Sequence, residues 1–244
     1  MSRRINRRTR KIAALTGGLL VVGIGATYTL ASWNDSEWVW GGASGGPGIG
    51  TSGFEIEQNT VASGAAVWVD EESNPGGALT FTPGALALSP GDSVYAPVSL
   101  RTKAGSLGGD VTLQGAVAAS GVTPIAGKPL DGPTTGAGGT PGPLWAAARV
   151  SVYTSTASTA PSCDSTSVED EDWGPAVAGL SNAALGTAAG TAQALAAATP
   201  TVAGAPQHYC FVITLPSGSQ TGTGGELMNR TIAPAWEFRA VSTS

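Results

Sequence analysis

Two segments of this 244-residue chain carry the residue pattern of β-strands. In Ser93–Thr102, SVYAPVSLRT, an apolar residue stands at every second position over most of the segment, which is the period of a strand with one buried face. Tyr209–Pro216, YCFVITLP, is rich in β-branched and aromatic residues, which favour strands. Because a strand is stable only beside hydrogen-bonded neighbours, the chain is predicted to fold around β-sheet. Pro97 lacks an N–H, so we expect it at a sheet edge or a bulge.

Shorter runs with strand character occur after residue 53, separated by stretches rich in Gly, Pro, Ser and Thr. They are Phe54–Glu57, Ala65–Val69, Leu79–Phe81, Leu86–Leu88, Asp110–Val117, Leu144–Thr154 and Arg230–Val241. In the fifth run we expect Val111, Leu113 and Val117 to face inward. In the last run we expect Trp236 and Phe238 to share one face.

The composition agrees with short strands joined by turns. The chain has 36 Gly, 16 Pro and only 12% charged residues, whereas a helical bundle is rich in Leu, Glu and Lys. Gly121–Pro143 is predicted to be a long loop. In the Ala-rich segment Ala176–Ala203 we expect a helical turn near Leu180–Leu185 and a short strand near Gln193–Ala197. These patterns predict an all-β domain over residues 54–244, a jelly-roll-like β-sandwich of mainly antiparallel strands.

Residues 1–32 have the three parts of a secretory signal peptide with a hydrophobic helix. The basic residues come first: Arg3, Arg4, Arg7, Arg8, Arg10 and Lys11. The uncharged run Ile12–Leu30 follows, and small residues then precede Trp33, so we expect a signal peptidase to cut after Ala31 or Ser32. The alternative is a retained anchor, because about 19 apolar residues can span a bilayer. Four glycines inside the run favour cleavage, and a twin-arginine route lacks the expected continuation after either Arg pair.

Residues 33–53 are predicted to form a flexible N-terminal arm. Trp38, Val39 and Trp40 make a short apolar cluster, and the Gly-rich stretch 41–48 that follows is typical of a tether. Together with Trp33 these residues are candidates for contact with another subunit or surface protein. The alternative is that Trp38 and Trp40 pack on the chain's own core, as large aromatic residues usually do.

The charge and the cysteine content restrict which classes of partner the chain can bind and in which compartment it works. Six of the 12 Lys+Arg and none of the 17 Asp+Glu lie in the signal, so the remainder carries 6 − 17 = −11. This negative charge repels phosphate backbones and argues against nucleic acid as a partner. In an exported chain, Cys163 and Cys210 are predicted to form one disulfide, and the alternative is two buried thiols.

The sequence offers few candidates for catalysis. His208 is the one histidine, so a His-Glu-x-x-His zinc site is excluded, and we expect it to be a strand-edge residue without a metal. Gly42–Gly46 matches Gly-x-Ser-x-Gly but lies in the tether. The acidic run Glu169, Asp170, Glu171 and Asp172 is a weak Ca²⁺ candidate, whose alternative is a solvated loop. The sequence predicts no cofactor.

Several short segments resemble a known family. The signal followed by Trp33, Asn34 and Asp35 resembles those cut by the SipW type of signal peptidase. The segments Leu88–Pro97, Leu100–Thr102, Tyr209–Phe211, Thr214–Pro216 and Trp236–Phe238 resemble actinobacterial alternate signal-mediated exported proteins, distant relatives of the TasA/camelysin family. The resemblance implies export of a jelly-roll-like domain that forms fibres when the N-terminal segment of one chain adds a strand to the next. Camelysin relatives are described as metallopeptidases, but this chain lacks the zinc motif.

Three functions follow as hypotheses. The first is an exported, non-enzymatic structural protein of the cell surface or extracellular matrix that self-associates by strand addition. The second is a secreted carbohydrate-binding or adhesive module in which Trp and Tyr side chains stack on ligand, so burial of Trp68 and Trp145 would count against it. The third is a camelysin-like peptidase. In each case membrane contact is expected only through an uncleaved signal.

Overall fold

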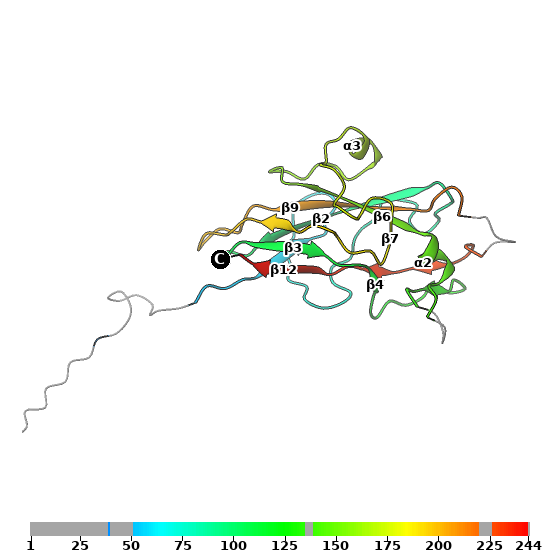
Figure 1. Cartoon of the computed structure of the whole chain (residues 1–244), viewed down its shortest axis with the longest axis horizontal. Helices are drawn as coiled ribbons and strands as arrows, with labels where there is room; N and C mark the ends of the chain where they lie inside the picture. Colours follow the sequence, from blue (N-terminus) through cyan, green and yellow to red (C-terminus); the bar gives the residue numbers. More distant parts are fainter. Residues whose placement is uncertain (1–38, 40–50, 135–138, 220–225, 244) are drawn as a thin grey trace, which may run out of the picture. The chain divides into compact units, whose positions relative to one another are not determined.

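The computed structural model describes residues 39, 51–134, 139–219 and 226–243 (Figure 1). The chain divides into two compact units, Met1–Gly50 and Thr51–Ser244, and the fold below is that of the second. The predicted signal peptide and its helix lie outside the described residues, as does most of the predicted arm.

The larger sheet has five antiparallel strands in the order β1-β2-β9-β6-β7. They are β1 (Ile56–Asn59), β2 (Ser93–Thr102), β9 (Gln207–Thr214), β6 (Arg149–Ser155) and β7 (Ala183–Ala184). The strand predicted at Ser93–Thr102 is confirmed with its bounds, and the one predicted at Tyr209–Pro216 begins and ends two residues earlier than predicted. Seven of the eight residues of the central strand β9 are buried, so both of its faces are covered.

A second layer faces this sheet. Its three-stranded sheet has the order β12-β3-β8 and consists of β12 (Phe238–Ser242), β3 (Gly109–Leu113) and β8 (Gln193–Leu195). Two short pairs extend the layer: β4 (Val117–Ala118) with β11 (Pro234–Ala235), antiparallel, and β5 (Leu130–Asp131) with β10 (Thr231–Ile232), parallel. Figure 1 shows β2, β6 and β9 above β3, β4 and β12. The apolar core lies between the layers, which confirms an all-β, sandwich-like fold of mainly antiparallel strands.

Within the described ranges, two short helices interrupt the strands: α2 (Pro143–Ala147) and α3 (Ser165–Glu169). The strand predicted at Leu144–Thr154 is therefore wrong in its first part, and β6 begins only at Arg149. Proline is favourable in the first helical turn because its missing N–H would have no partner there. The Leu144 N–H donates to the buried carboxylate of Asp131 at 2.8 Å, which satisfies another unpaired donor of the helix.

Five further strand predictions need correction. Leu79–Phe81 and Leu86–Leu88 form no strand and lie in turns and irregular chain. In Ala65–Val69 only Val69 pairs, with Gln58 of β1. Val117 does not face inward but is 51% exposed, because the chain leaves β3 after Leu113 and Val117 belongs to the separate pair β4–β11. The predicted strand Arg230–Val241 is divided into β10, β11 and β12. The inward positions of Val111 and Leu113 are confirmed.

The Ala-rich segment joins the two sheets. The predicted helical turn at Leu180–Leu185 is wrong, because the chain here forms β7 and turns, while the short strand expected near Gln193 is confirmed as β8. The Val177 N–H donates to the carbonyl of Val152 in β6, and further on the Ala189 N–H donates to the carbonyl of Leu113 in β3. These external partners replace the internal hydrogen bonds of a helix. The segment also brings Leu180 and Leu185 into the core.

Pro97 lies where β2 is locally an edge strand, as predicted. β1 pairs only with the second half of β2, from Ser99 onward. On the side of β2 away from β9, the Tyr95 N–H donates to the Thr82 hydroxyl at 3.1 Å, and the Tyr95 carbonyl accepts from the Thr82 N–H at 2.8 Å. Backbone groups alternate in direction along a strand, so the nitrogen of Pro97 faces the same side as that of Tyr95. The missing N–H therefore costs no hydrogen bond to β9.

Candidate functional site

The predicted contact and cleavage residues fall mainly outside the described residues. Ala31, Ser32, Trp33, Trp38 and Trp40 all lie there. Val39 is described and is 94% exposed. The Gly-x-Ser-x-Gly match at 42–46 also lies outside the described residues. The roles given to these residues therefore stay predictions.

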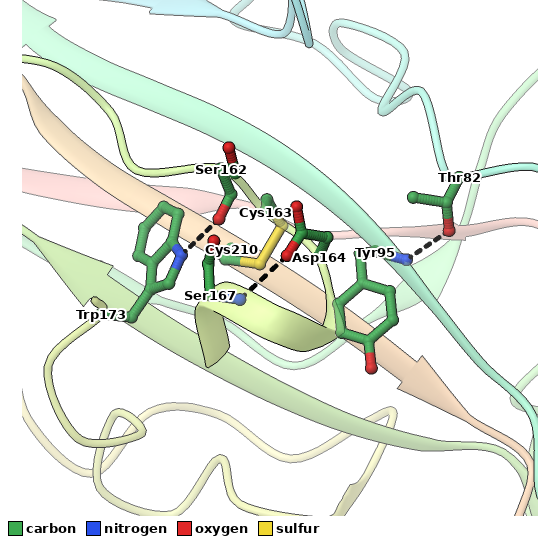
Figure 2. The surroundings of a disulfide bond; sticks show 8 residues. All are labelled: Thr82, Tyr95, Ser162, Cys163, Asp164, Ser167, Trp173 and Cys210. Carbon is green, nitrogen blue, oxygen red and sulfur yellow. Dashed lines mark hydrogen bonds between the residues drawn. A yellow bond between two sulfur atoms is a disulfide. The ribbon is translucent and has the colours of Figure 1, made fainter. Parts of the chain in front are cut away.

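The disulfide between Cys163 and Cys210 is confirmed, and it attaches a covering segment to the outer face of the large sheet (Figure 2). The two Cα atoms are 5.4 Å apart and 47 residues apart in sequence. Asp164 caps α3 by accepting from the Ser167 N–H at 2.9 Å, and Trp173 Nε1–H donates to the Ser162 carbonyl at 2.8 Å. These bonds hold the segment in a compact shape.

A small second core lies beneath this segment. Trp173, Cys210 and Val212 are buried together, and Tyr95, Tyr153, Cys163 and Val168 pack around them. The outer face of β9 is covered here, which explains why this strand shows no alternation of buried and exposed residues. The disulfide thus fixes a layer that the sequence did not predict.

The acidic run lies at the end of α3 and points to solvent. Glu169, Asp170, Glu171 and Asp172 are all exposed. Burial, together with the charge of Glu169, raises the pKa of the Tyr95 hydroxyl. In the ranges that the structure describes, no three His, Cys, Asp or Glu side chains are grouped to hold a metal ion.

His208 and Ser99 form a buried pair that the sequence did not reveal. His208 was expected at a strand edge, but it lies on the central strand β9 directly opposite Ser99 of β2. The Ala157 carbonyl can only accept, so His208 Nε2 carries the proton and donates to it at 3.1 Å, and Nδ1 accepts from the Ser99 hydroxyl at 2.6 Å. The catalytic triad of serine hydrolases also contains a serine bonded to a histidine, with a carboxylate as the third group. Here both residues are only 5–6% exposed, and the third group is a carbonyl and not a carboxylate, so the pair does not match a triad.

Acid is expected to destabilise the fold through His208. Burial lowers the pKa of His208 below its ordinary value near 6.5. The unfolded chain therefore binds a proton at a pH where the folded chain does not, so the free energy of unfolding falls as pH drops below about 6.5 and levels off below the lowered pKa. Denaturant titrations between pH 4.5 and 8 check this. His208→Gln should flatten the curve in this window, and an unchanged curve would contradict the assignment.

Asp131 joins three elements at one end of the sandwich. Its side chain is 3% exposed; one oxygen accepts from the Leu144 N–H of α2 and the other from Arg230 Nη1 at 2.7 Å. A Cβ at Gly142 would lie 2.5 Å from the Asp131 side chain, so only glycine permits this approach. The sequence placed Asp131 in a long loop, and no local pattern identified the pair with Arg230.

The tryptophans proposed to stack on a ligand differ in exposure. Trp145 is 5% exposed and belongs to the core, which removes it as a ligand-stacking residue. Trp68 is partly buried, with the Arg101 guanidinium 4.0 Å from its ring centre. Arg101 Nε also bonds Glu57 at 2.5 Å. One face of the Trp68 ring is therefore already occupied by this cation.

β12 is an edge strand of the three-stranded sheet. β12 pairs with β3 on one side, and within the described ranges its other side has no strand neighbour. Next to β12, the Glu237 carbonyl accepts from the Gln114 N–H at 2.8 Å, and the Thr243 N–H donates to the Gly108 carbonyl at 3.0 Å; Gln114 and Gly108 flank β3. Because backbone groups alternate, the N–H and C=O groups of Phe238, Ala240 and Ser242 point away from β3. An edge of this kind can accept a strand from another chain.

The side chains at this edge are incompletely covered. Phe238 and Ala240 of β12, and Trp236 just before it, pack against the core but remain only partly buried. On the opposite side of β3, where the Ala-rich segment closes the sandwich, Leu180 and Leu185 are each 1% exposed. The core is therefore closed on one side of β3 and less completely covered at β12.

Two buried donors beside β12 have no hydrogen-bond partner in the described part of the chain: Tyr209 Oη and Trp236 Nε1. The Tyr209 ring packs on Phe238 with centres 4.9 Å apart, and burial raises the pKa of the Tyr209 hydroxyl. Tyr209→Phe is expected to raise the free energy of unfolding by up to about 1 kcal/mol, because it removes a polar group that lost its water without gaining a partner. Denaturant unfolding measures this. A loss above about 1 kcal/mol would instead mean that the hydroxyl has a partner.

Comparisons of the chain with protein-family models, with curated proteins and with solved structures found no match. Among the helices in the described ranges, none has the length and apolar character needed to cross a bilayer.

Proposed function

We propose that this protein is an exported, non-enzymatic structural subunit of the cell surface or extracellular matrix that self-associates by strand addition. The observation that carries the proposal is the open edge of β12, where three residues present backbone groups without a strand neighbour in the described ranges. Main-chain hydrogen bonds to an added strand supply affinity at such an edge. The arm Trp33–Trp40, with its aromatic residues, is the proposed donor of a strand to a neighbouring copy.

The disulfide supports a location outside the cytoplasm, because disulfide bonds persist in oxidising compartments. The signal pattern in residues 1–32 supports the same location. Within this proposal the sandwich is of the jelly-roll type, the signal is of the SipW type, and the protein is a distant relative of the TasA/camelysin family. Mass spectrometry of the exported protein tests the processing: we expect a chain that begins at Ser32 or Trp33 and is two hydrogens lighter than its reduced form.

Self-association is tested by light scattering and electron microscopy of the exported protein over a wide concentration range. We expect assemblies that grow with concentration and are weakened when Trp38 and Trp40 are replaced by Ser. The Trp68→Ser variant is a matched control, because it also removes a tryptophan but lies outside the arm. A strict monomer at high concentration would overturn the proposal.

A further inference from the structure

The charges that flank the open backbone of β12 restrict how a second chain can pair with it. Glu237 and Arg239 project from the side of the strand opposite the core and are 60% and 63% exposed. They lie on either side of Phe238, whose backbone groups face the open edge. Along the strand, a negative side chain therefore precedes Phe238 and a positive side chain follows it. When a second copy of the strand runs antiparallel, the order of its charges is reversed, so each negative side chain can face a positive one.

Only backbone groups that face outward can form hydrogen bonds across the new contact. Each of Phe238, Ala240 and Ser242 must therefore lie opposite a residue of this same set in the second copy. If Phe238 lies opposite Ala240 of the second copy, then Arg239 faces Arg239, and like charges directly opposite are unfavourable. If Ala240 lies opposite Ala240, then Arg239 faces Val241. If Phe238 lies opposite Phe238, then Glu237 faces Arg239 twice, once on each side of the axis. Charge complementarity selects this last register.

We propose that β12 pairs with β12 of a second copy, antiparallel and centred on Phe238. The two-fold axis is perpendicular to the sheet, so the pair forms one continuous six-stranded sheet with both cores on the same side. The inference rests on the proposed self-association but not on the arm. A two-fold contact closes as a dimer, whereas a head-to-tail contact through the arm can propagate. Because β12 has a single open edge, it can hold only one of these partners at a time, so the two contacts compete for it.

The test uses charge reversal in the exported protein. Glu237→Arg places two arginines opposite each other on each side of the axis, and Arg239→Glu does the same with two glutamates. Each single variant is expected to dimerise roughly 3- to 30-fold more weakly than the wild type. An equimolar mixture of the two variants should recover the wild-type affinity as a mixed dimer, because every facing pair is then opposite in charge. The double variant Glu237→Arg/Arg239→Glu should recover it alone.

Sedimentation velocity measures the dimer, and thermal melting of each variant checks the fold, which these exposed side chains should not affect. Recovery in the mixture, with weak dimers of each variant alone, supports the two-fold register. Single variants that self-associate like the wild type would overturn this inference and leave the proposed function standing. A wild type that stays monomeric would overturn both.

Discussion

Replacement of the disulfide, as Cys163→Ser with Cys210→Ala, is expected to lower the free energy of unfolding by roughly 3–5 kcal/mol. The bond closes a loop over a sequence separation of 47 residues, and its loss releases that constraint in the unfolded chain. In the folded chain it also releases the segment over β9, whose Trp173 and Val168 depend on Cys163 for their position.

Denaturant unfolding of the oxidised, reduced and substituted proteins measures this effect. Reduced wild type should match the substituted protein, and added reductant should not change the substituted protein further. In the substituted protein, the backbone amides of residues 161–173 should exchange their hydrogens faster than those of β2 or β6. A loss below about 1 kcal/mol would mean that packing alone holds the covering segment in place.

The second large effect is expected at Asp131. Asp131→Ala should lower the free energy of unfolding by about 2–4 kcal/mol, because it leaves Arg230 and the Leu144 N–H without their acceptor. The carboxylate is 3% exposed, but Arg230 is 28% exposed, so water can partly solvate the remaining guanidinium. The expected loss is therefore smaller than for a fully buried pair.

A double-mutant cycle with Arg230→Met separates the ion pair from the bond to α2. The matched control is Glu237→Gln, which breaks the exposed pair with Arg239 at 3.2 Å and should cost less than about 1 kcal/mol. Equal losses at the buried and the exposed pair would contradict the role of Asp131 as the link between α2, β5 and β10.

Much of the large sheet could be predicted because its signals are local. The alternation in Ser93–Thr102 placed β2 with its bounds, and the apolar character of Tyr209–Pro216 located β9. Val111 and Leu113 were correctly placed inward by the same two-residue period. The disulfide was predicted from the cysteine count and the expected compartment, since only one pairing is possible.

The errors lie where a distant partner decided the local structure. Leu144 was assigned to a strand, but its N–H donates to Asp131, 13 residues earlier in the chain, and its segment is helical. The Ala-rich segment lost its predicted helical turn because Val152 and Leu113 supply its hydrogen bonds. In each case the deciding group lies outside the window in which a sequence pattern is recognised.

By itself, the sequence determined the all-β class, two principal strands and the disulfide pair, because side-chain periodicity and cysteine count are properties of the chain alone. The tertiary structure decided that His208 is buried against Ser99, that Asp131 holds Arg230, and that β12 has a strand neighbour on only one side within the described ranges. These features depend on which strands become neighbours. Strand order is set by packing between residues far apart in sequence, and no single segment encodes it.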